Sequence, residues 1–198
     1  MASTCPSSNG RSPGARGIGF KITTKLCALP GCCSTLRRPV MNNLSRMLAT
    51  LAQGGVEFVL VGGYAAVAHG VTLVTQDVDI CCRFSKENLF RLQAVLWGLH
   101  PRHRMTPQKL PLELTDELCA RLKNLYLETD LCLLDCLSEV KGVGDFGTVL
   151  GHSIEVAFPG GTFRVLDLAT LIAAKEAMDR PQDRLALTQL RAIWERKG

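Results

Sequence analysis

The sequence lacks an uninterrupted apolar run of the ~20 residues that a membrane-spanning helix needs. Its longest apolar stretch, around Val56 to Ala68, is interrupted by Glu57, Gly62 and Gly63. Acidic residues are missing from residues 1–40, although that segment holds six Lys and Arg side chains. The first absence argues against a membrane protein, and the second concentrates the excess positive charge in one segment.

The net charge of +5 therefore says little about the rest of the chain. Six of the 23 basic side chains fall in residues 1–40, which leaves 17 basic and 18 acidic side chains in residues 41–198. A strongly basic domain surface is the electrostatic mark of a nucleic-acid-binding protein. The charge distribution does not indicate one here.

Residues 1–40 are rich in Ser, Gly, Pro and Arg and show no apolar periodicity. This composition predicts a disordered N-terminal extension. Two origins fit it: an organellar transit-type segment, or upstream sequence translated ahead of a natural start at Met41. Ordered patterning begins directly after Met41, so we expect the folded domain to span residues 41–198.

Nine cysteines are present, but their placement does not indicate a disulfide framework. Cys81 and Cys82 are adjacent, the total is odd, and no secretory apolar segment precedes them. We therefore expect reduced thiols and a cytoplasmic protein. Cys27, Cys32 and Cys33 offer zinc ligands, but no second cysteine pair or nearby histidine completes a site.

Apolar periodicity and turn residues predict alternating helices and strands. The expected strands are 57–61, 77–82, 125–127, 131–137, 154–158 and 163–166. The expected helices are 44–51, 64–69, 85–99, a short one after Thr115, 167–178 and 181–196, with a proline-rich loop at 100–114. Together they predict an α+β fold with a small mixed sheet, helices on one side and a helical C-terminus.

Two short motifs carry the candidate chemistry. Gly62-Gly63 follow a predicted strand and precede a helix, where the backbone can approach a phosphate. Asp77 and Asp79 share one face of the next strand, while the residues between and after them point into the core. Adjacent carboxylates repel unless a cation lies between them, and Mg²⁺ prefers such oxygen ligands. The alternative is a pair of exposed aspartates on a solvated strand.

Asp135 is the third candidate acid. It lies in the apolar run Leu131 to Leu137, where an unpaired carboxylate is costly and needs a partner. If this strand lies beside the strand of Asp77 and Asp79, the three acids converge on one or two metal ions. Asp130 falls in the predicted turn, where aspartate is common, and ranks below Asp135.

In combination, these motifs resemble the DNA polymerase β-type nucleotidyltransferase superfamily. Its pattern has a glycine turn, an Asp-x-Asp pair and a later strand aspartate, as in Gly62-Gly63, Asp77-Val-Asp79 and Asp135. The closer similarity is to small nucleotidyltransferase-like proteins of prokaryotes, including minimal nucleotidyltransferases and relatives of abortive-infection toxins.

Two further segments extend the resemblance, which covers about Met41 to Glu195. Thr75 matches a threonine two residues before the first aspartate of the family's pattern. Lys175 and Arg180–Asp183 resemble a lysine and an Arg-Pro-Lys-Asp sequence near the family's C-terminus, with Gln182 at the lysine position. The alternative for Lys175 is a solvated side chain on an amphipathic helix.

The resemblance implies functional residues at matching positions. It implies catalytic and metal-binding carboxylates at Asp77, Asp79 and Asp135, holding Mg²⁺ or Mn²⁺. It implies nucleotide-binding residues at Gly62, Gly63, Thr75 and Lys175.

The implied reaction is transfer of a nucleoside monophosphate from a nucleoside triphosphate to a hydroxyl group on a protein, a tRNA or a small molecule. The sequence leaves the acceptor and the base open. A non-catalytic nucleotidyltransferase-fold partner in a toxin–antitoxin pair is the alternative. Another interpretation takes the basic loop with Arg102, His103, Arg104 and Lys109 as an RNA contact, although aromatic residues do not interleave it.

Overall fold

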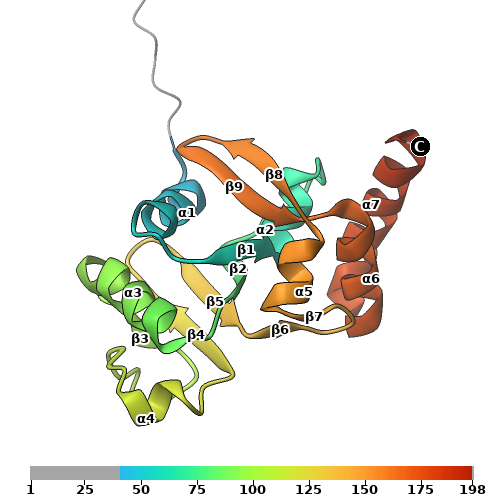
Figure 1. Cartoon of the computed structure of the whole chain (residues 1–198). Coiled ribbons are helices and arrows are strands. Elements are labelled where there is room, and N and C mark those ends of the chain that lie inside the picture. The colour runs from blue at the N-terminus through green and yellow to red at the C-terminus, as the bar shows by residue number, and fades with distance from the viewer. Residues whose placement is uncertain (1–40, 198) are drawn as a thin grey trace, which may run out of the picture. The chain divides into compact units, whose positions relative to one another are not determined.

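The computed structural model describes residues 41–197. The predictions for residues 1–40, including the zinc candidates, lie outside this range. A seven-stranded mixed sheet in the order β3-β4-β5-β2-β1-β9-β8 forms the centre of the domain (Figure 1). Its strands are β1 (Phe58–Val61), β2 (Asp77–Cys82), β3 (Arg102–His103), β4 (Asn124–Glu128), β5 (Leu133–Leu137), β8 (Ser153–Phe158) and β9 (Gly161–Leu166).

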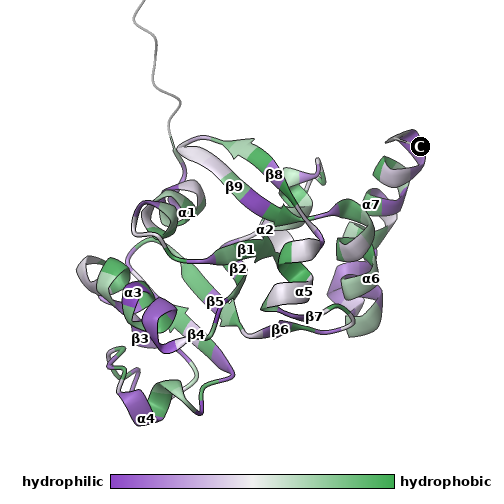
Figure 2. Cartoon of the chain, in the orientation of Figure 1, coloured by the Kyte–Doolittle hydropathy of each residue, from purple (hydrophilic) through white to green (hydrophobic). Residues whose placement is uncertain are grey.

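The three central strands are the most apolar ones. β1, β5 and much of β2 are coloured as hydrophobic in Figure 2. β2 pairs antiparallel with β1 and parallel with β5, and β4 pairs antiparallel with β5 as the predicted hairpin. Strands that are covered on both faces consist of nearly continuous apolar residues, so their positions can be predicted from the sequence. The predicted mixed sheet is confirmed.

The helices begin where the sequence provides caps. The side chains of Ser85, Thr115 and Asp167 each accept a hydrogen bond from a backbone N–H three residues later. No helix within residues 41–197 combines the length and the apolar character that crossing a bilayer requires. The helices are α1 (Asn43–Gln53), α2 (Gly62–Ala68), α3 (Lys86–Leu96), α4 (Asp116–Cys119), α5 (Phe146–Gly151), α6 (Leu168–Met178) and α7 (Arg184–Lys197).

The two faces of β2 differ in character. Val78 and Ile80 are fully buried on one face, whereas Asp77 and Asp79 are half-buried on the other. α1 and α3 pack against each other over the apolar face, and α6 and α7 pack together at the C-terminus (Figure 1). The expected arrangement of the main helices and of the helical C-terminus is confirmed.

Residues 139–151 contain structure that the sequence does not predict. β6 (Glu139–Val140) and β7 (Gly144–Asp145) form a two-stranded ribbon, and α5 follows directly. Asp145 caps α5 by accepting a hydrogen bond from Thr148 N at 3.0 Å. Strands of two residues are too short to show a period, so apolar spacing could not reveal the ribbon. The expected last helix also differs, because Pro181–Asp183 form a 3₁₀ turn before α7.

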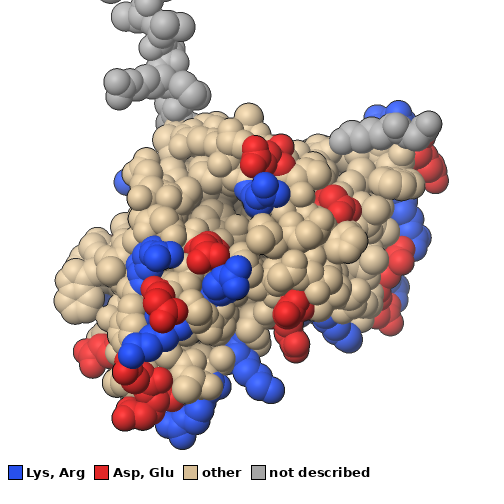
Figure 3. Space-filling view, in the orientation of Figure 1, with Lys and Arg blue, Asp and Glu red and all other residues tan. Residues whose placement is uncertain are grey.

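Charged side chains of both signs are interspersed over the face shown in Figure 3. Lys86 pairs with Asp116 and Lys109 pairs with Glu128, each at 2.5 Å. These pairs are exposed, so water and salt screen them and each contributes little to stability. The Lys109–Glu128 pair neutralises one of the basic side chains that the RNA interpretation needs.

A buried asparagine joins α3 to the central strands. Asn88 is 1% exposed, and its Oδ1 accepts a hydrogen bond from Glu57 N at 2.8 Å. Its Nδ2 donates to Glu57 O at 3.1 Å and to Arg83 O at 2.9 Å. The carboxamide therefore satisfies backbone groups at the start of β1 and the end of β2 together.

We expect Asn88→Ala to lower the free energy of unfolding by about 2–3 kcal/mol, because it leaves Glu57 N and Arg83 O without a partner, while Glu57 O keeps its bond from Arg83 N. Chemical denaturation measures the change. Glu87→Ala, an exposed neighbour on the same helical turn, is the control and should have a clearly smaller effect, because water screens its charge. Equal effects of the two substitutions would contradict the role given to Asn88.

Candidate active site

The strand register brings the predicted acids together. Val61, the last residue of β1, pairs with Asp79, and Asp79 pairs with Asp135 on β5. Asp77 lies two residues earlier on β2 and therefore shares the face of Asp79. The structure thus places the three carboxylates on one face of two neighbouring strands, as the sequence predicts.

Asp130 takes no part in this cluster. It lies in the turn before β5, where its carboxylate pairs with His100 Nδ1 at 2.7 Å on the exposed surface. His69, at the end of α2, is also structural, because its buried ring nitrogen bonds to Leu166 O at 2.8 Å. The placement of Asp130 agrees with its rank below Asp135 in the sequence analysis.

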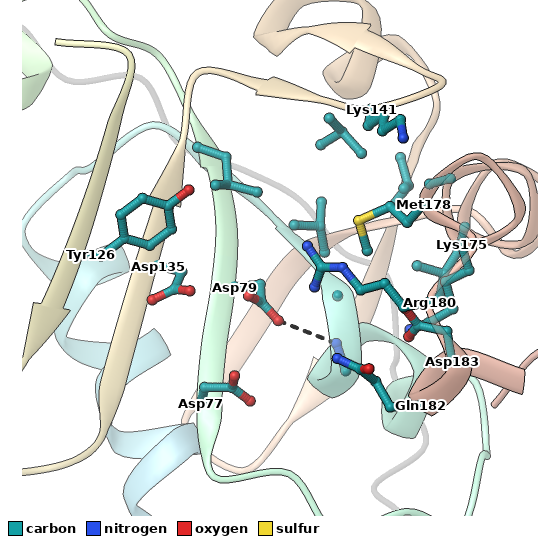
Figure 4. A pocket seen from close by; sticks show the side chains of 18 of the residues that line it. Asp77, Asp79, Tyr126, Asp135, Lys141, Lys175, Met178, Arg180, Gln182 and Asp183 are labelled. Atoms are coloured by element: carbon teal, nitrogen blue, oxygen red, sulfur yellow. Dashed lines mark hydrogen bonds and ion pairs between the residues drawn. The ribbon is translucent and has the colours of Figure 1, made fainter. Parts of the chain in front are cut away.

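The glycine pair turns the chain from β1 into α2 directly against Asp79. Gly62 has a φ of +64°, in the left-handed region that favours glycine. A Cβ at this position would lie 2.0 Å from Asp79 Oδ2. Gly63 N donates to the same oxygen at 3.3 Å, marked by the dashed line in Figure 4. The turn needs glycine at Gly62 because the carboxylate occupies the space that a side chain would take.

Thr75 orients the first aspartate. Its hydroxyl donates to Asp77 Oδ1 at 2.6 Å. The same hydroxyl lies 3.0 Å from the position of a Cβ on Gly63. Thr75 therefore links the glycine turn to Asp77, and this contact gives it a role independent of any nucleotide.

Arg104 is bound to the third aspartate. Its Nη2 lies 2.6 Å from Asp135 Oδ1 and 2.5 Å from Oδ2. The guanidinium also lies 5.7 Å from the ring centroid of Tyr126, which pairs with Asp135 across the strands. The sequence places Arg104 in a basic surface loop, whereas the structure places it against the candidate catalytic acid.

Lys175 is buried, so the solvated alternative for this side chain is wrong. It is 5% exposed, and its Nζ lies 2.5 Å from Asp183 Oδ1. This pair connects α6 to the turn that precedes α7. A buried ion pair of this kind is costly to break, because removing one partner leaves the other charge uncompensated.

These groups line one cavity of about 410 Å³, a volume within the range of small-molecule sites. In Figure 4, Tyr126 and Asp135 lie on one side of Asp79, and the α6–α7 residues lie on the other. Residues from both sides and from the β6–β7 ribbon form the lining, including Asp77, Asp79, Arg104, Tyr126, Asp135, Lys141, Lys175, Arg180, Gln182 and Asp183.

Burial changes the ionisation of two of the acids. Desolvation, reinforced by the negative charges of Asp77 and Asp135, raises the pKa of Asp79 from 3.8 to about 6. Desolvation also raises the pKa of Asp135, although the Arg104 guanidinium opposes the change. A cation between the carboxylates would offset this cost, which is the electrostatic situation of a metal site.

The donor set suits a hard cation. Asp77 and Asp79 present carboxylate oxygens from one strand face, the ligand type that Mg²⁺ and Mn²⁺ prefer. Within residues 41–197, no three His, Cys, Asp or Glu side chains are already arranged to hold a metal ion. Both Asp135 oxygens face Arg104, so an ion shared by all three acids would have to take Asp135 from that partner.

The comparisons with known proteins give a match at the level of structure. A scan against protein-family models gives no match, and a search of curated protein sequences gives none either. The lincosamide antibiotic adenylyltransferase LnuA, bound to lincomycin, matches with a TM-score of 0.54 and 14% identity, over 76% of this chain and 96% of that chain.

The antibiotic-resistance factor ANT(2'')-Ia also matches. Its solution structure has a TM-score of 0.52 and 18% identity, over 79% of this chain and 83% of that chain. A crystal structure of ANT(2'')-Ia in complex with adenylyl-2''-tobramycin is a weaker match, with a TM-score of 0.46 and 20% identity over 77% and 95% of the two chains. LnuA and ANT(2'')-Ia are nucleotidyltransferase-fold proteins, and this chain has that fold.

Sequence reasoning missed part of the cavity wall. Lys141 lies on the unpredicted β6–β7 ribbon, and Arg180 was noted only as part of a resemblance. Arg104 was assigned to a surface loop. A contact over 31 positions, such as Arg104 with Asp135, leaves no periodic signal in the sequence.

We expect Gly62→Ala to disrupt the site, because the new Cβ would displace the Asp79 carboxylate and strain a left-handed residue. The free energy of unfolding should fall by about 1–3 kcal/mol in thermal or chemical denaturation. Gly98→Ala is the matched control, since a Cβ there meets no atom within 4 Å. A Gly62→Ala protein as stable as the Gly98→Ala protein would exclude the close approach described here.

The raised pKa of Asp79 predicts a pH dependence of stability in chelator-treated protein. Because the folded state holds the Asp79 proton more tightly than the unfolded state, this group favours folding below pH 4. Its contribution is lost as the pH rises from 3.8 to about 6. Asp79→Asn should therefore gain about 1–2 kcal/mol relative to the parent protein between pH 4 and pH 7, measured by urea denaturation. If the difference in the free energy of unfolding between the two proteins does not change with pH, the raised pKa of Asp79 is contradicted.

Proposed function

We propose that this protein is a nucleotidyltransferase that moves a nucleoside monophosphate from a nucleoside triphosphate to a hydroxyl group of a small molecule. The observation that carries the proposal is the placement of Asp77, Asp79 and Asp135 on one face of β2 and β5, beside the glycine turn and inside a cavity. LnuA, which shares the fold, is an antibiotic adenylyltransferase. That likeness favours a small-molecule acceptor over a protein or a tRNA.

In this proposal Asp77 and Asp79 would hold Mg²⁺ or Mn²⁺, and the ion would supply positive charge to offset the negative charge of the triphosphate. Gly62 and Gly63 let the backbone approach the phosphates without a side chain in the way. Thr75 fixes the orientation of Asp77 through its hydrogen bond.

Asp135 lines the same cavity, and we assign to it the role of accepting the proton of the attacking hydroxyl group. The acceptor oxygen forms a bond to the α-phosphorus, and the bond from that phosphorus to the bridging oxygen breaks. Pyrophosphate leaves, so atoms and charge balance without a covalent protein intermediate. Positioning of the two substrates supplies most of the acceleration that such a site can give.

The second candidate is a non-catalytic partner of a toxin–antitoxin pair. One observation favours it: two of the four carboxylates that line the cavity already have a basic partner, because Asp135 pairs with Arg104 and Asp183 pairs with Lys175. Such a partner has no need to bind a triphosphate in a metal-dependent way. Metal-dependent nucleotide binding therefore separates the two candidates.

We expect the Asp77→Asn and Asp79→Asn double variant to lose nucleotidyl transfer by at least about a thousandfold, because it removes the proposed metal ligands. It should also lose the rise in melting temperature that Mg²⁺ with ATP gives the parent protein. The assay follows label from α-³²P-labelled nucleoside triphosphates into a panel of hydroxyl-bearing small molecules, with differential scanning fluorimetry in parallel.

Asp130→Asn is the matched control, since Asp130 lies at the surface with His100. It should keep both the transfer and the metal-dependent stabilisation. If the double variant keeps its metal-dependent shift, the metal ligands lie elsewhere. If the parent protein shows no such shift, the non-catalytic candidate is favoured.

A further inference from the structure

The sheet itself holds Arg104 beside the acids. Arg104 follows β3 directly, and its backbone N–H donates to Tyr126 O at 3.0 Å, which continues the pairing of β3 with β4. Tyr126 pairs with Asp135, and Asp135 pairs with Asp79. The four residues therefore form one row across neighbouring segments of the sheet, and Figure 4 shows Tyr126, Asp135 and Asp79 in that order. Arg104 is thus the cation at the end of a row of residues set by strand pairing.

Two groups hold the Arg104 side chain in place. Its Nη2 contacts both oxygens of Asp135, at 2.6 and 2.5 Å, and its guanidinium lies 5.7 Å from the ring centroid of Tyr126. An aromatic face attracts a cation at that distance. The side chain of Arg104 is 27% exposed and that of Asp135 is 12% exposed. Separating this pair would leave a poorly hydrated carboxylate without its partner, which is costly.

Asp77 and Asp79 differ from Asp135, because neither forms an ion pair within residues 41–197. Neutral donors engage one oxygen of each: the Thr75 hydroxyl donates to Asp77, and Gly63 N donates to Asp79. The other oxygen of each carboxylate accepts no hydrogen bond from the same part of the chain. Together the two side chains carry two negative charges, which one divalent ion balances.

A second ion would need Asp135 as a ligand. The two ions of a two-metal site lie about 3.5–4 Å apart, so carboxylates on neighbouring strands would have to serve both. At Asp135 an ion would have to displace the guanidinium and would then lie close to the positive charge of Arg104. Like charges at short range in a partly buried site repel strongly. The guanidinium already provides the positive charge that Asp135 needs.

We propose that the site binds a single divalent ion, through Asp77 and Asp79, and that the Arg104 guanidinium takes the place at Asp135 that a second ion would occupy. This inference rests on the proposed function and makes Arg104 a positioning residue within it. Asp135 can still accept a proton in that arrangement, because its two oxygens offer about four lone-pair sites and the Arg104 contacts use two of them.

The test uses the full chain and Mn²⁺ as the probe, with and without one equivalent of the α,β-methylene analogue of ATP, which does not transfer its nucleotide. Equilibrium dialysis counts the bound ions. Low-temperature electron paramagnetic resonance shows whether bound ions are paired, because two Mn²⁺ about 3.5–4 Å apart couple magnetically. We expect the parent protein to bind one Mn²⁺ per chain and to give the spectrum of an isolated ion under both conditions.

Arg104→Ala should bind two Mn²⁺ per chain and give the spectrum of a coupled pair, because it frees both oxygens of Asp135. Arg104→Gln keeps much of the side-chain volume without the charge and should do the same, so the test does not depend on one variant. Adding Asp135→Asn to Arg104→Ala should restore the single isolated ion. Lys109→Ala, a basic change on the same loop paired with Glu128 at the surface, is the matched control and should keep the parent spectrum.

Circular dichroism establishes that each variant is folded. A coupled pair of ions in the parent protein would overturn the inference, as would a single isolated ion in both Arg104→Ala and Arg104→Gln. The Asp77→Asn and Asp79→Asn double variant distinguishes failure of the proposed function. If that variant keeps the ion that the parent protein binds, or if the parent protein binds none with or without the analogue, the proposed function itself is contradicted.

Discussion

The pairing of β2 with β1 on one side and β5 on the other determines where every candidate functional group lies. Side chains alternate along a strand, so a slip of one residue would turn Asp135 from the cavity into the apolar core. The fully buried Val78 and Ile80 on the opposite face make such a slip costly, because it would exchange them with carboxylates. The chemistry of the site therefore depends on apolar packing that takes no direct part in it.

The same packing imposes a cost on the acids. Asp79 lies deep enough that desolvation and two neighbouring carboxylates raise its pKa to about 6. The structure offsets part of this cost locally, with Gly63 N and Thr75 donating to Asp79 and Asp77, and Arg104 facing Asp135. The negative charge that these contacts leave uncompensated lies between Asp77 and Asp79. A divalent cation at that position would stabilise the folded protein most.

Local spacing was enough to predict much of this arrangement. The two-residue spacing of Asp77 and Asp79 predicts that they share one strand face, and the adjacent glycines predict the turn. The cost of a carboxylate in an apolar run singles out Asp135 as the third acid. The contacts of Arg104, Asn88 and Lys175 could not be predicted, because each joins elements whose relative position only the folded chain sets. The β6–β7 ribbon could not be predicted from the sequence, because two-residue strands have no measurable period.

The sheet and part of the cavity wall are encoded in different parts of the chain. The reacting end of the cavity is built on β1, β2 and β5, the most deeply packed strands of the sheet. Part of the cavity wall is built on the loop after β3 and on the β6–β7 ribbon, short elements that contribute Arg104 and Lys141. A shared fold at 14–18% identity supports an inference about the strands of the sheet and none about the side chains of the cavity wall. Side chains on short surface segments can change without disturbing the central register, so the selectivity of the cavity has to be argued from those side chains and not from the fold.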